Sequence, residues 1–212
     1  MNQLQTVIDV NQPPLRRSDL QPSPDQQFSQ WFDEAEERRV PDREAMCLST
    51  VKSDGMPASR MVLLKSFDQD GLVFFTNFES DKAHEIAVRP LVALLFFWPT
   101  VYRQIRVNGQ VEKIAREDSL DYFYSRPRAS QIGAWASRQS HKQATRADLE
   151  ARYAALEERF KSGKVAEPDF WGGFRVLPQQ WEFWQGQPNR LHDRFRYSRT
   201  AAHNWEITRL DP

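Results

Sequence analysis

The fold of this chain is decided by residues 45–76, which read AMCLSTVKSDGMPASRMVLLKSFDQDGLVFFT. Two polar segments, 53–55 and 68–71, interrupt its apolar runs with the Asp, Ser and Gly residues that are typical of tight turns. The pattern therefore predicts strands over 45–51, 59–65 and 72–76. Three strands joined by tight turns form an antiparallel meander, which we expect to close as a barrel or a sandwich.

Apolar stretches further along the chain extend this sheet. We predict a buried strand over 91–97, an alternating strand over 102–115, and later strands over 180–184, 194–197 and 205–210. Asn108-Gly109, within the alternating strand, is either a hairpin turn or a β-bulge. Strands at both ends of the chain with helices between them predict an α+β fold, mainly β, whose last strands complete the sheet.

Helix signals lie before and between the strands. Ser23-Pro24-Asp25-Gln26 predicts a helix start, and that helix ends before Pro41. Further helices are predicted from Ser80 to Pro90, over 119–125, and from Thr145 to Gly163. Residues 1–22 are polar and contain three prolines, so we expect a flexible N-terminal arm followed by a single domain over 23–212.

Composition excludes several classes of function. Lys+Arg 29 balance Asp+Glu 29, so no nucleic-acid or membrane partner is expected. The longest apolar run, 91–98, is far shorter than the roughly 20 residues that span a bilayer, and the polar N-terminal residues give no reason to expect a signal peptide. A single cysteine, Cys47, and four scattered histidines predict neither a disulfide framework nor a metal site. A cytoplasmic protein is expected.

Positive charges inside core-like segments are the first candidates for a binding site. Arg60 and Lys65 lie at the two ends of an apolar strand and, being five residues apart, point to opposite faces. They bind two different anions, or one binds an anion and the other lies at the surface. The alternative is that both are strand-end side chains that reach solvent. Lys82, in the first turn of a helix, opposes the helix dipole, so it marks either an anion site or an exposed lysine with a small cost.

Two further clusters carry groups suited to phosphate or to a ring. Tyr122 and Arg126 share one helix face and Ser130 follows closely, a set that indicates either phosphate binding or a capped helix end. Arg190 and His192 project to the same side of an extended segment. Together these clusters predict two cationic sites beside aromatic side chains, as a phosphorylated ring cofactor and a phosphorylated substrate require.

At these residues the chain resembles the pyridoxine/pyridoxamine 5′-phosphate oxidase family. The resemblance runs from about Leu15 to Pro212 and rests on RMVLLK (60–65), SRPRASQIGAW (125–135), SRQS (137–140), FWGGFR (170–175), EFWQG (182–186) and RLHDR (190–194). It implies an FMN-dependent homodimer with a split β-barrel core and active sites at the subunit interface.

The resemblance also implies roles for individual residues. The implied FMN contacts are Arg60, Met61, Val62, Leu63, Leu64, Lys65, Phe75, Thr76, Lys82, Gln104, Gln139, Ser140, Trp184 and Arg194. The implied substrate-phosphate contacts are Lys65, Tyr122, Arg126 and Ser130. Arg190 and His192 are the implied catalytic pair, lying over the substrate ring opposite the flavin.

Two positions depart from the family pattern. Asp81 stands where the family usually has an arginine, which predicts weaker cofactor affinity. The segment 7–10 lacks the Arg and Tyr with which the family often covers its substrate, so no lid of that chemistry is expected.

The expected reaction is oxidation of pyridoxamine 5′-phosphate or pyridoxine 5′-phosphate at C4′ to pyridoxal 5′-phosphate, with FMN taking a hydride and O₂ reoxidising it to give H₂O₂. The rivals are a related flavin oxidase of phenazine assembly, whose substrate would not use Tyr122, Arg126 and Ser130, and a non-catalytic carrier of pyridoxal phosphate or flavin.

Overall fold

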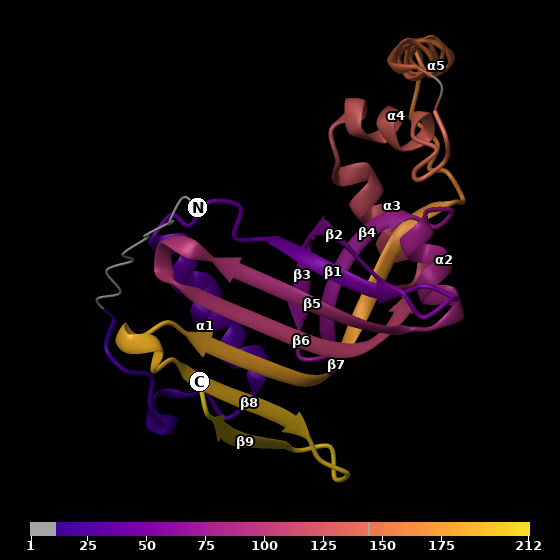
Figure 1. Cartoon of the computed structure of the whole chain (residues 1–212). Helices are drawn as coiled ribbons and strands as arrows, with labels where there is room; N and C mark the ends of the chain where they lie inside the picture. The colour runs from indigo at the N-terminus through magenta and orange to yellow at the C-terminus, as the bar shows by residue number, and fades with distance from the viewer. Residues whose placement is uncertain (1–11, 144) are drawn as a thin grey trace, which may run out of the picture.

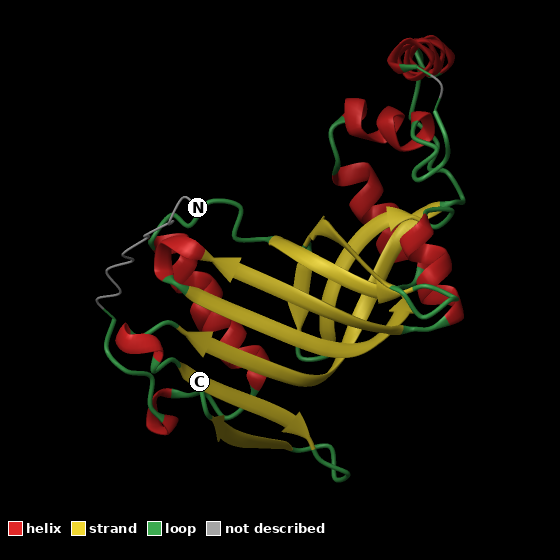
Figure 2. Cartoon of the chain, in the orientation of Figure 1, coloured by secondary structure: helices red, strands yellow, loops and turns green. Residues whose placement is uncertain are grey.

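In the part of the chain that the structure describes, the sheet is antiparallel, has nine strands and curls into a half-barrel (Figures 1 and 2). It is seen in a computed structural model that describes residues 12–143 and 145–212. The strand order is β2-β1-β5-β6-β7-β4-β3, with β8 beside β7 and β9 beside β8. The strands are β1 (Ala45–Val51), β2 (Pro57–Leu63), β3 (Ser66–Asp68), β4 (Gly71–Asn77), β5 (Leu91–Trp98), β6 (Arg103–Lys113), β7 (Trp171–Gln185), β8 (Asp193–Arg199) and β9 (Trp205–Leu210). The predicted mainly β, split-barrel fold is confirmed.

The predicted meander of the first strands is wrong. β2 pairs with β1, but β4 pairs with β3 and β7, at the other end of the strand order. The switch falls between two adjacent residues: Leu64 N–H donates to Glu44 O on the β1 side, at 2.8 Å, and Lys65 N–H donates to Val73 O of β4, at 2.9 Å. Leu64 is buried in the core at this corner, so the chain turns there instead of extending one strand to Lys65.

The Asn108-Gly109 dipeptide is a β-bulge, not a hairpin turn. The register of β6 against β7 shifts between these two residues, opposite Pro178. A Cβ atom on Gly109 would lie 2.3 Å from Leu177 O, so glycine is required for this close approach. β7 is far longer than the predicted 180–184, because Gly172, Gly173 and Pro178 weaken the strand signal of its first half.

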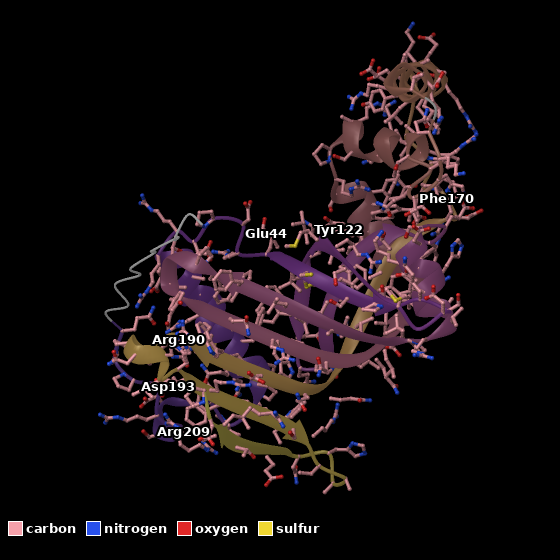
Figure 3. All side chains as sticks on the ribbon, in the orientation of Figure 1. Glu44, Tyr122, Phe170, Arg190, Asp193 and Arg209 are labelled. Atoms are coloured by element: carbon pink, nitrogen blue, oxygen red, sulfur yellow. The ribbon has the colours of Figure 1, made fainter. Side chains whose placement is uncertain are left out.

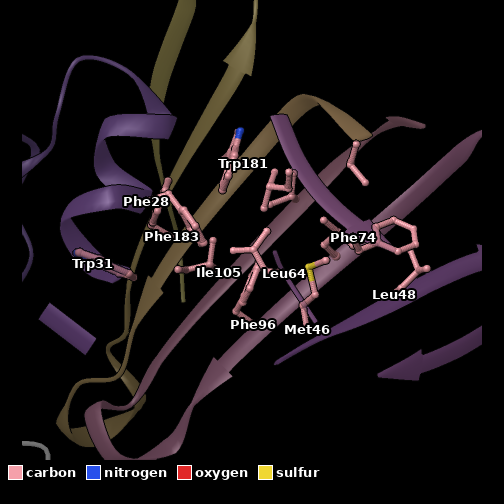
Figure 4. Close-up of a cluster of buried hydrophobic side chains, with 14 of the residues drawn as sticks. Phe28, Trp31, Met46, Leu48, Leu64, Phe74, Phe96, Ile105, Trp181 and Phe183 are labelled. Atoms are coloured by element: carbon pink, nitrogen blue, oxygen red, sulfur yellow. The ribbon is translucent and has the colours of Figure 1, made fainter. Parts of the chain in front are cut away.

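Aromatic side chains fill the main core between the sheet and α1 (Pro24–Glu37). In Figure 4, Phe28 and Trp31 of α1 point toward Trp181 and Phe183 of β7. The Phe28 ring centroid lies 5.4 Å from that of Trp181, and the Trp31 centroid 5.2 Å from that of Phe183. Both α1 side chains are almost fully buried, so they anchor this helix on the sheet.

The remaining helices gather at the opposite end of the sheet (Figure 1). They are α2 (Asp81–Val88), α3 (Arg116–Ser125), α4 (Arg128–Ala136) and α5 (Arg146–Arg159). The sequence did not predict α4, because Arg126-Pro127 was interpreted as a helix end and Pro127 is in fact the N-cap of a new helix. The Thr145 and Asp148 capping box is confirmed, with Asp148 N–H donating to Thr145 Oγ1 at 3.2 Å.

The N-terminal segment 12–22 lies against the sheet rather than apart from it. Leu15 and Leu20 are buried in the main core, and Tyr197 Oη donates to Gln21 O at 2.8 Å. The rest of the predicted arm, including segment 7–10, is outside the described residues. Within the described part of the chain, no helix is long and apolar enough to cross a membrane.

Candidate active site

A cavity of about 440 Å³ opens where β2 and β4 face α3 and α4, and we call it the α3–α4 cavity. It brings together predicted flavin and predicted substrate residues from distant parts of the sequence. Its lining includes Met61, Val62, Leu63, Lys65, Phe75, Thr76, Lys82, Tyr122, Arg126, Ser130 and Gln139. Asn77, Gly133, Ala134, Ser137 and Trp171 complete it. This volume lies within the range of small-molecule sites.

One wall of the cavity is a stack of three aromatic rings. The Phe75 centroid lies 4.0 Å from that of Tyr122 and 5.3 Å from that of Trp171, with small interplanar angles. Sequence reasoning missed Trp171 as a site residue, because an aromatic residue beside Gly172-Gly173 looks like ordinary core. The stack presents flat apolar surface to a ligand ring.

Arg126 provides a positive charge beside this aromatic wall. Its Cζ lies 4.7 Å from the centroid of the Trp171 ring, and its Nη2 donates to Ser130 O at 3.1 Å. Its Nη1 is buried and has no hydrogen-bond partner among the described residues. Burial lowers the pKa of Arg126, although an arginine stays charged. A buried donor without a partner favours an anionic ligand at this point.

Lys82 holds the other side of the cavity and is buried, contrary to the alternative of an exposed lysine. Its Nζ donates to Gln139 Oε1 at 2.7 Å and to Thr76 Oγ1 at 3.1 Å. Burial, followed by the nearby charge of Arg60, lowers the pKa of Lys82 to about 8. Ser140, beside Gln139, accepts a hydrogen bond from Asp81 N–H at 3.2 Å but does not line the cavity.

Arg60 and Leu64, two of the predicted flavin contacts, do not line the cavity. Arg60 Nη2 contacts Glu85 Oε2 at 2.8 Å, and its Nη1 donates to Thr50 Oγ1 and to Ala58 O. Burial acts to raise the pKa of Glu85, but hydrogen bonds from Thr50 and Arg60 leave it below its ordinary value. Arg60 and Lys65 are not at the two ends of one strand as predicted, because β2 ends at Leu63 and Lys65 lies beyond it. Arg60 is paired with Glu85, and Lys65 is exposed at the cavity.

The predicted site residues Gln104, Trp184, Arg190, His192 and Arg194 form a second group, and with the neighbouring Tyr102 we call them the Trp184 cluster. The Trp184 ring centroid lies 4.7 Å from that of His192 and 5.3 Å from that of Tyr102. Gly186 permits this packing, since a Cβ there would lie 1.7 Å from the Tyr102 ring. Tyr102 was missed by sequence reasoning, which found no local signal for it.

Two polar members of the Trp184 cluster, Arg194 and His192, have hydrogen-bond partners within the protein. Arg194 donates from Nε and Nη2 to Glu182 Oε1, at 3.0 and 2.9 Å, and Glu182 is buried. His192 Nδ1 accepts a hydrogen bond from Gln187 N–H at 3.1 Å. Burial, followed by the charge of Arg190, lowers the pKa of His192, so its imidazole is mostly neutral at pH 7.

The two groups lie near opposite ends of strand β7. Trp171 of the cavity begins this strand and Trp184 of the cluster is its last residue but one, 13 residues further along, which is on the order of 40 Å of extended strand. Figure 3 accordingly shows Tyr122 and Arg190 far apart on the molecule. No residue of the Trp184 cluster lines the α3–α4 cavity. A single chain therefore does not bring all the predicted site residues together.

Known proteins resemble this chain over nearly its whole length. A family model described as pyridoxamine 5′-phosphate oxidase matches residues 32–160, and one described as a pyridoxine 5′-phosphate oxidase C-terminal dimerisation region matches 171–212. A pyridoxine/pyridoxamine 5′-phosphate oxidase of Bordetella petrii is 50% identical over 90% of each chain. One of Burkholderia orbicola is 48% identical over 97% of this chain and 96% of its own.

Solved structures share the fold. PhzG from Burkholderia lata 383, in complex with tetrahydrophenazine-1-carboxylic acid, has a TM-score of 0.86 and 29% identity, covering 92% of this chain and 95% of its own. A pyridoxamine 5′-phosphate oxidase-related, FMN-binding protein from Nostoc punctiforme has a TM-score of 0.72, covers 90% of this chain and 98% of its own, and is 18% identical, which supports the fold alone.

Proposed function

Since the chain belongs to the pyridoxamine 5′-phosphate oxidase family and is thus an oxidoreductase, we propose that it oxidises pyridoxamine 5′-phosphate or pyridoxine 5′-phosphate at C4′. The product is pyridoxal 5′-phosphate, and O₂ is the electron acceptor that yields H₂O₂; the amine substrate also consumes one water and releases ammonia, whereas the alcohol substrate does not. The observation that carries this proposal is the buried, unpartnered Nη1 of Arg126 in the α3–α4 cavity.

The substrate phosphate is assigned to the set that surrounds Arg126. Tyr122, Ser130 and Lys65 line the same cavity and supply a phenol, a hydroxyl and an ammonium group. These groups with a guanidinium match the acceptor oxygens of a phosphate. The Phe75, Tyr122 and Trp171 stack beside them provides apolar surface next to that anion site.

The cavity also suits FMN, the flavin that this family implies. Lys82, Thr76 and Gln139 are already joined by hydrogen bonds, and with Met61 to Leu63 of β2 they would hold its phosphate and ring edge. When bound, FMN supplies the two-electron acceptor for C4′ and the means of passing those electrons to O₂. The residues of this chain would bind the substrate and orient its C4′ carbon for that oxidation.

We assign the residues that complete the site to a second copy of the chain. The match to a dimerisation region over 171–212 supports a homodimer, and that region contains most of the Trp184 cluster. In a two-fold dimer, one end of a strand on one protomer can meet the other end on its partner. We therefore place the partner's copies of Arg190, His192, Trp184 and Arg194 over the mouth of each α3–α4 cavity.

His192 is suited to orient the substrate ring rather than to remove a proton. Its Nδ1 accepts from Gln187 N–H, so the neutral imidazole carries its proton on Nε2 and donates there. Arg190 lies exposed two residues earlier and offers a flat guanidinium to stack on the ring. No base is assigned, since hydride loss from C4′ does not require one.

The test is the visible spectrum of the purified protein combined with its reaction. We expect bound flavin absorbance that is bleached by pyridoxamine 5′-phosphate without air, and equal amounts of pyridoxal 5′-phosphate and H₂O₂ in air. Tight binding of pyridoxal 5′-phosphate without turnover would instead support a carrier.

The similarity to PhzG favours one rival, an oxidase of a ring substrate that carries a carboxylate. Arg126 would accept a carboxylate as well, but Tyr122, Ser130 and Lys65 would then have less to bind. Turnover of a dihydro- or tetrahydrophenazine carboxylate in preference to pyridoxamine 5′-phosphate would establish that rival.

A further inference from the structure

Asp193 is a buried charge at the point where β8 begins, between His192 and Arg194. Its side chain is only 3% exposed. Oδ2 accepts from Leu15 N–H at 2.9 Å, and Oδ1 contacts Arg209 Nη2 of β9 at 2.5 Å. Figure 3 shows Arg190, Asp193 and Arg209 in the same corner of the molecule. A buried carboxylate is costly unless it is paired and hydrogen-bonded, so this one joins three segments of the chain.

The N-terminal segment that Asp193 holds crosses the turn between β7 and β8. Pro13 O accepts from Gln185 Nε2 at 2.9 Å and from Gln187 Nε2 at 3.4 Å. Gln12 Nε2 donates to Val101 O, next to Tyr102. Segment 12–15 is thus fixed to β7, to the Tyr102 turn and, through Leu15, to Asp193. These contacts hold the end of β7 and the Tyr102 turn together beside the Trp184 cluster.

The loop between β7 and β8 needs such support. Asn189 and Arg190, in a 3₁₀ turn over Pro188–Arg190, have φ values of 58° and 62°, which non-glycine residues adopt at a cost. At one end, Gly186 N–H donates to Tyr102 O at 2.9 Å. At the other end the loop runs directly into Asp193. A strained loop keeps one conformation only when both of its ends are fixed.

We propose that Asp193 is a positioning residue for the active site: by joining segment 12–15 and Arg209 to the start of β8, it fixes the loop that carries Arg190 and His192. The Asp193 carboxylate is held by Leu15 N–H and Arg209 Nη2 and does not line the α3–α4 cavity, so it acts through Arg190 and His192. The proposal rests on the proposed function only for the role of Arg190 and His192 in turnover, and not for the geometry.

The test compares Asp193→Asn with Asp211→Asn, which removes an exposed carboxylate from the same end of the chain. The first readout is the nitrogen NMR spectrum of the His192 ring in ¹⁵N-histidine-labelled dimer, assigned by a His192→Gln variant. We expect one tautomer with the proton on Nε2 in the parent and in Asp211→Asn, and a tautomer mixture in Asp193→Asn. This readout needs no turnover, so it is independent of the proposed reaction.

The second readout is steady-state kinetics with pyridoxamine 5′-phosphate. Asp193→Asn should lower kcat about tenfold, because the ring-orienting groups are misplaced, while KM changes less than about twofold, because the phosphate is held at the α3–α4 cavity. A folded Asp193→Asn dimer with the parental His192 spectrum and parental kcat would overturn the proposal, even if its melting temperature fell.

Two milder variants keep the test valid if Asp193→Asn does not fold. Arg209 is 57% exposed at its side chain, so its replacement is tolerated more easily. Arg209→Gln should show partial tautomer mixing and a roughly threefold loss of kcat, and Arg209→Lys should restore the parental values. Identical results for Arg209→Gln and the parent in both readouts would also contradict the proposal.

Discussion

The α3–α4 cavity and the Trp184 cluster hold their arginines in opposite ways. In the cavity, Arg126 lies over an aromatic ring and keeps a buried donor free of protein partners among the described residues. In the cluster, Arg194 donates twice to the buried carboxylate of Glu182 and once to Asp211 O. A cation without a protein anion is suited to take the charge of a ligand, whereas a cation matched by the protein is suited to hold a surface in place.

In the proposed site shared between two copies, this difference gives the two regions separate tasks. The cavity supplies anion binding and one aromatic wall, and the cluster supplies oriented rings and hydrogen-bond donors. The β7 residues of the two regions, Trp171 and Trp184, lie near opposite ends of that strand. A substitution in one region can therefore be tested without changing the other.

The largest expected effect is at Arg126. Replacing Arg126 by Ala removes a charge-assisted hydrogen bond of about 1.5–3 kcal/mol, so KM for pyridoxamine 5′-phosphate should rise roughly ten- to a hundredfold. Arg146→Ala, which removes an exposed arginine of α5, is the control and should leave KM unchanged. If Arg126→Ala keeps the parental KM, the phosphate does not bind in the cavity.

A smaller effect is expected from Glu182→Gln, which disturbs only the cluster. Glu182 is buried and contacts both Arg194 and Arg106, so loss of its charge should destabilise the fold by about 1–2 kcal/mol. KM should stay within about twofold of the parent, since the cavity is untouched. Urea unfolding measures the first quantity, with the exposed Glu206→Gln as control. A large rise in KM would show that the two regions are not independent.

The buried Lys82 predicts opposite pH effects on stability and on flavin binding. Its pKa is about 8 in the folded chain and 10.5 in a free lysine, so between these values the unfolded chain binds more protons and stability rises with pH, by at most about 1 kcal/mol per unit. FMN affinity should fall over the same range, because a phosphate favours the charged lysine. Riboflavin, which lacks the phosphate, should show a smaller fall.

A Lys82→Met variant provides the control for this prediction. Subtracting its unfolding profile from that of the parent isolates the contribution of Lys82. The role of Lys82 as a buried lysine that binds the FMN phosphate would be ruled out if the difference in unfolding free energy stayed constant from pH 8 to pH 10. It would also be ruled out if FMN affinity rose over that range.

The smallest effect concerns the cavity wall itself. Gly133 lies within α4, and a Cβ there meets nothing within 4 Å, so Gly133→Ala should stabilise the fold by about 0.5–1 kcal/mol. Gly163→Ala has equal space but a φ of 86°, so it should destabilise. Because neither added Cβ meets another atom, the melting temperatures of the two variants report the backbone effect alone. A higher melting temperature for both variants would contradict this explanation.

Much of the sheet was predictable because alternation and turns are local signals. The strands near 45–51 and 91–97 and the helix after Ser80 follow from them. The switch at Leu64-Lys65 was not predictable, because it depends on which distant strand each backbone N–H meets. That 23–212 forms a single domain stays a prediction.

The candidate site divides in the same way. Tyr122, Arg126 and Ser130 were predicted as one group and do line one cavity. The predicted shared helix face of Tyr122 and Arg126 is wrong, because α3 ends at Ser125 and Arg126 is extended, with a ψ of 150°, before α4 begins. Trp171 and Tyr102 were not, since their importance arises from ring contacts made across the fold. The burial of Lys82 also depends on Gln139, which is distant in sequence.

The most direct test of a site shared between two copies is complementation in mixed dimers. Arg126→Ala and Arg190→Ala chains are each expected to give weakly active homodimers, and they are then co-expressed with different tags. In a shared site, half of the random dimers are mixed and each has one intact site of two, so about a quarter of the parental activity should return. If the mixture stays as inactive as its parents, both residues serve the same chain, and the two-copy site is wrong.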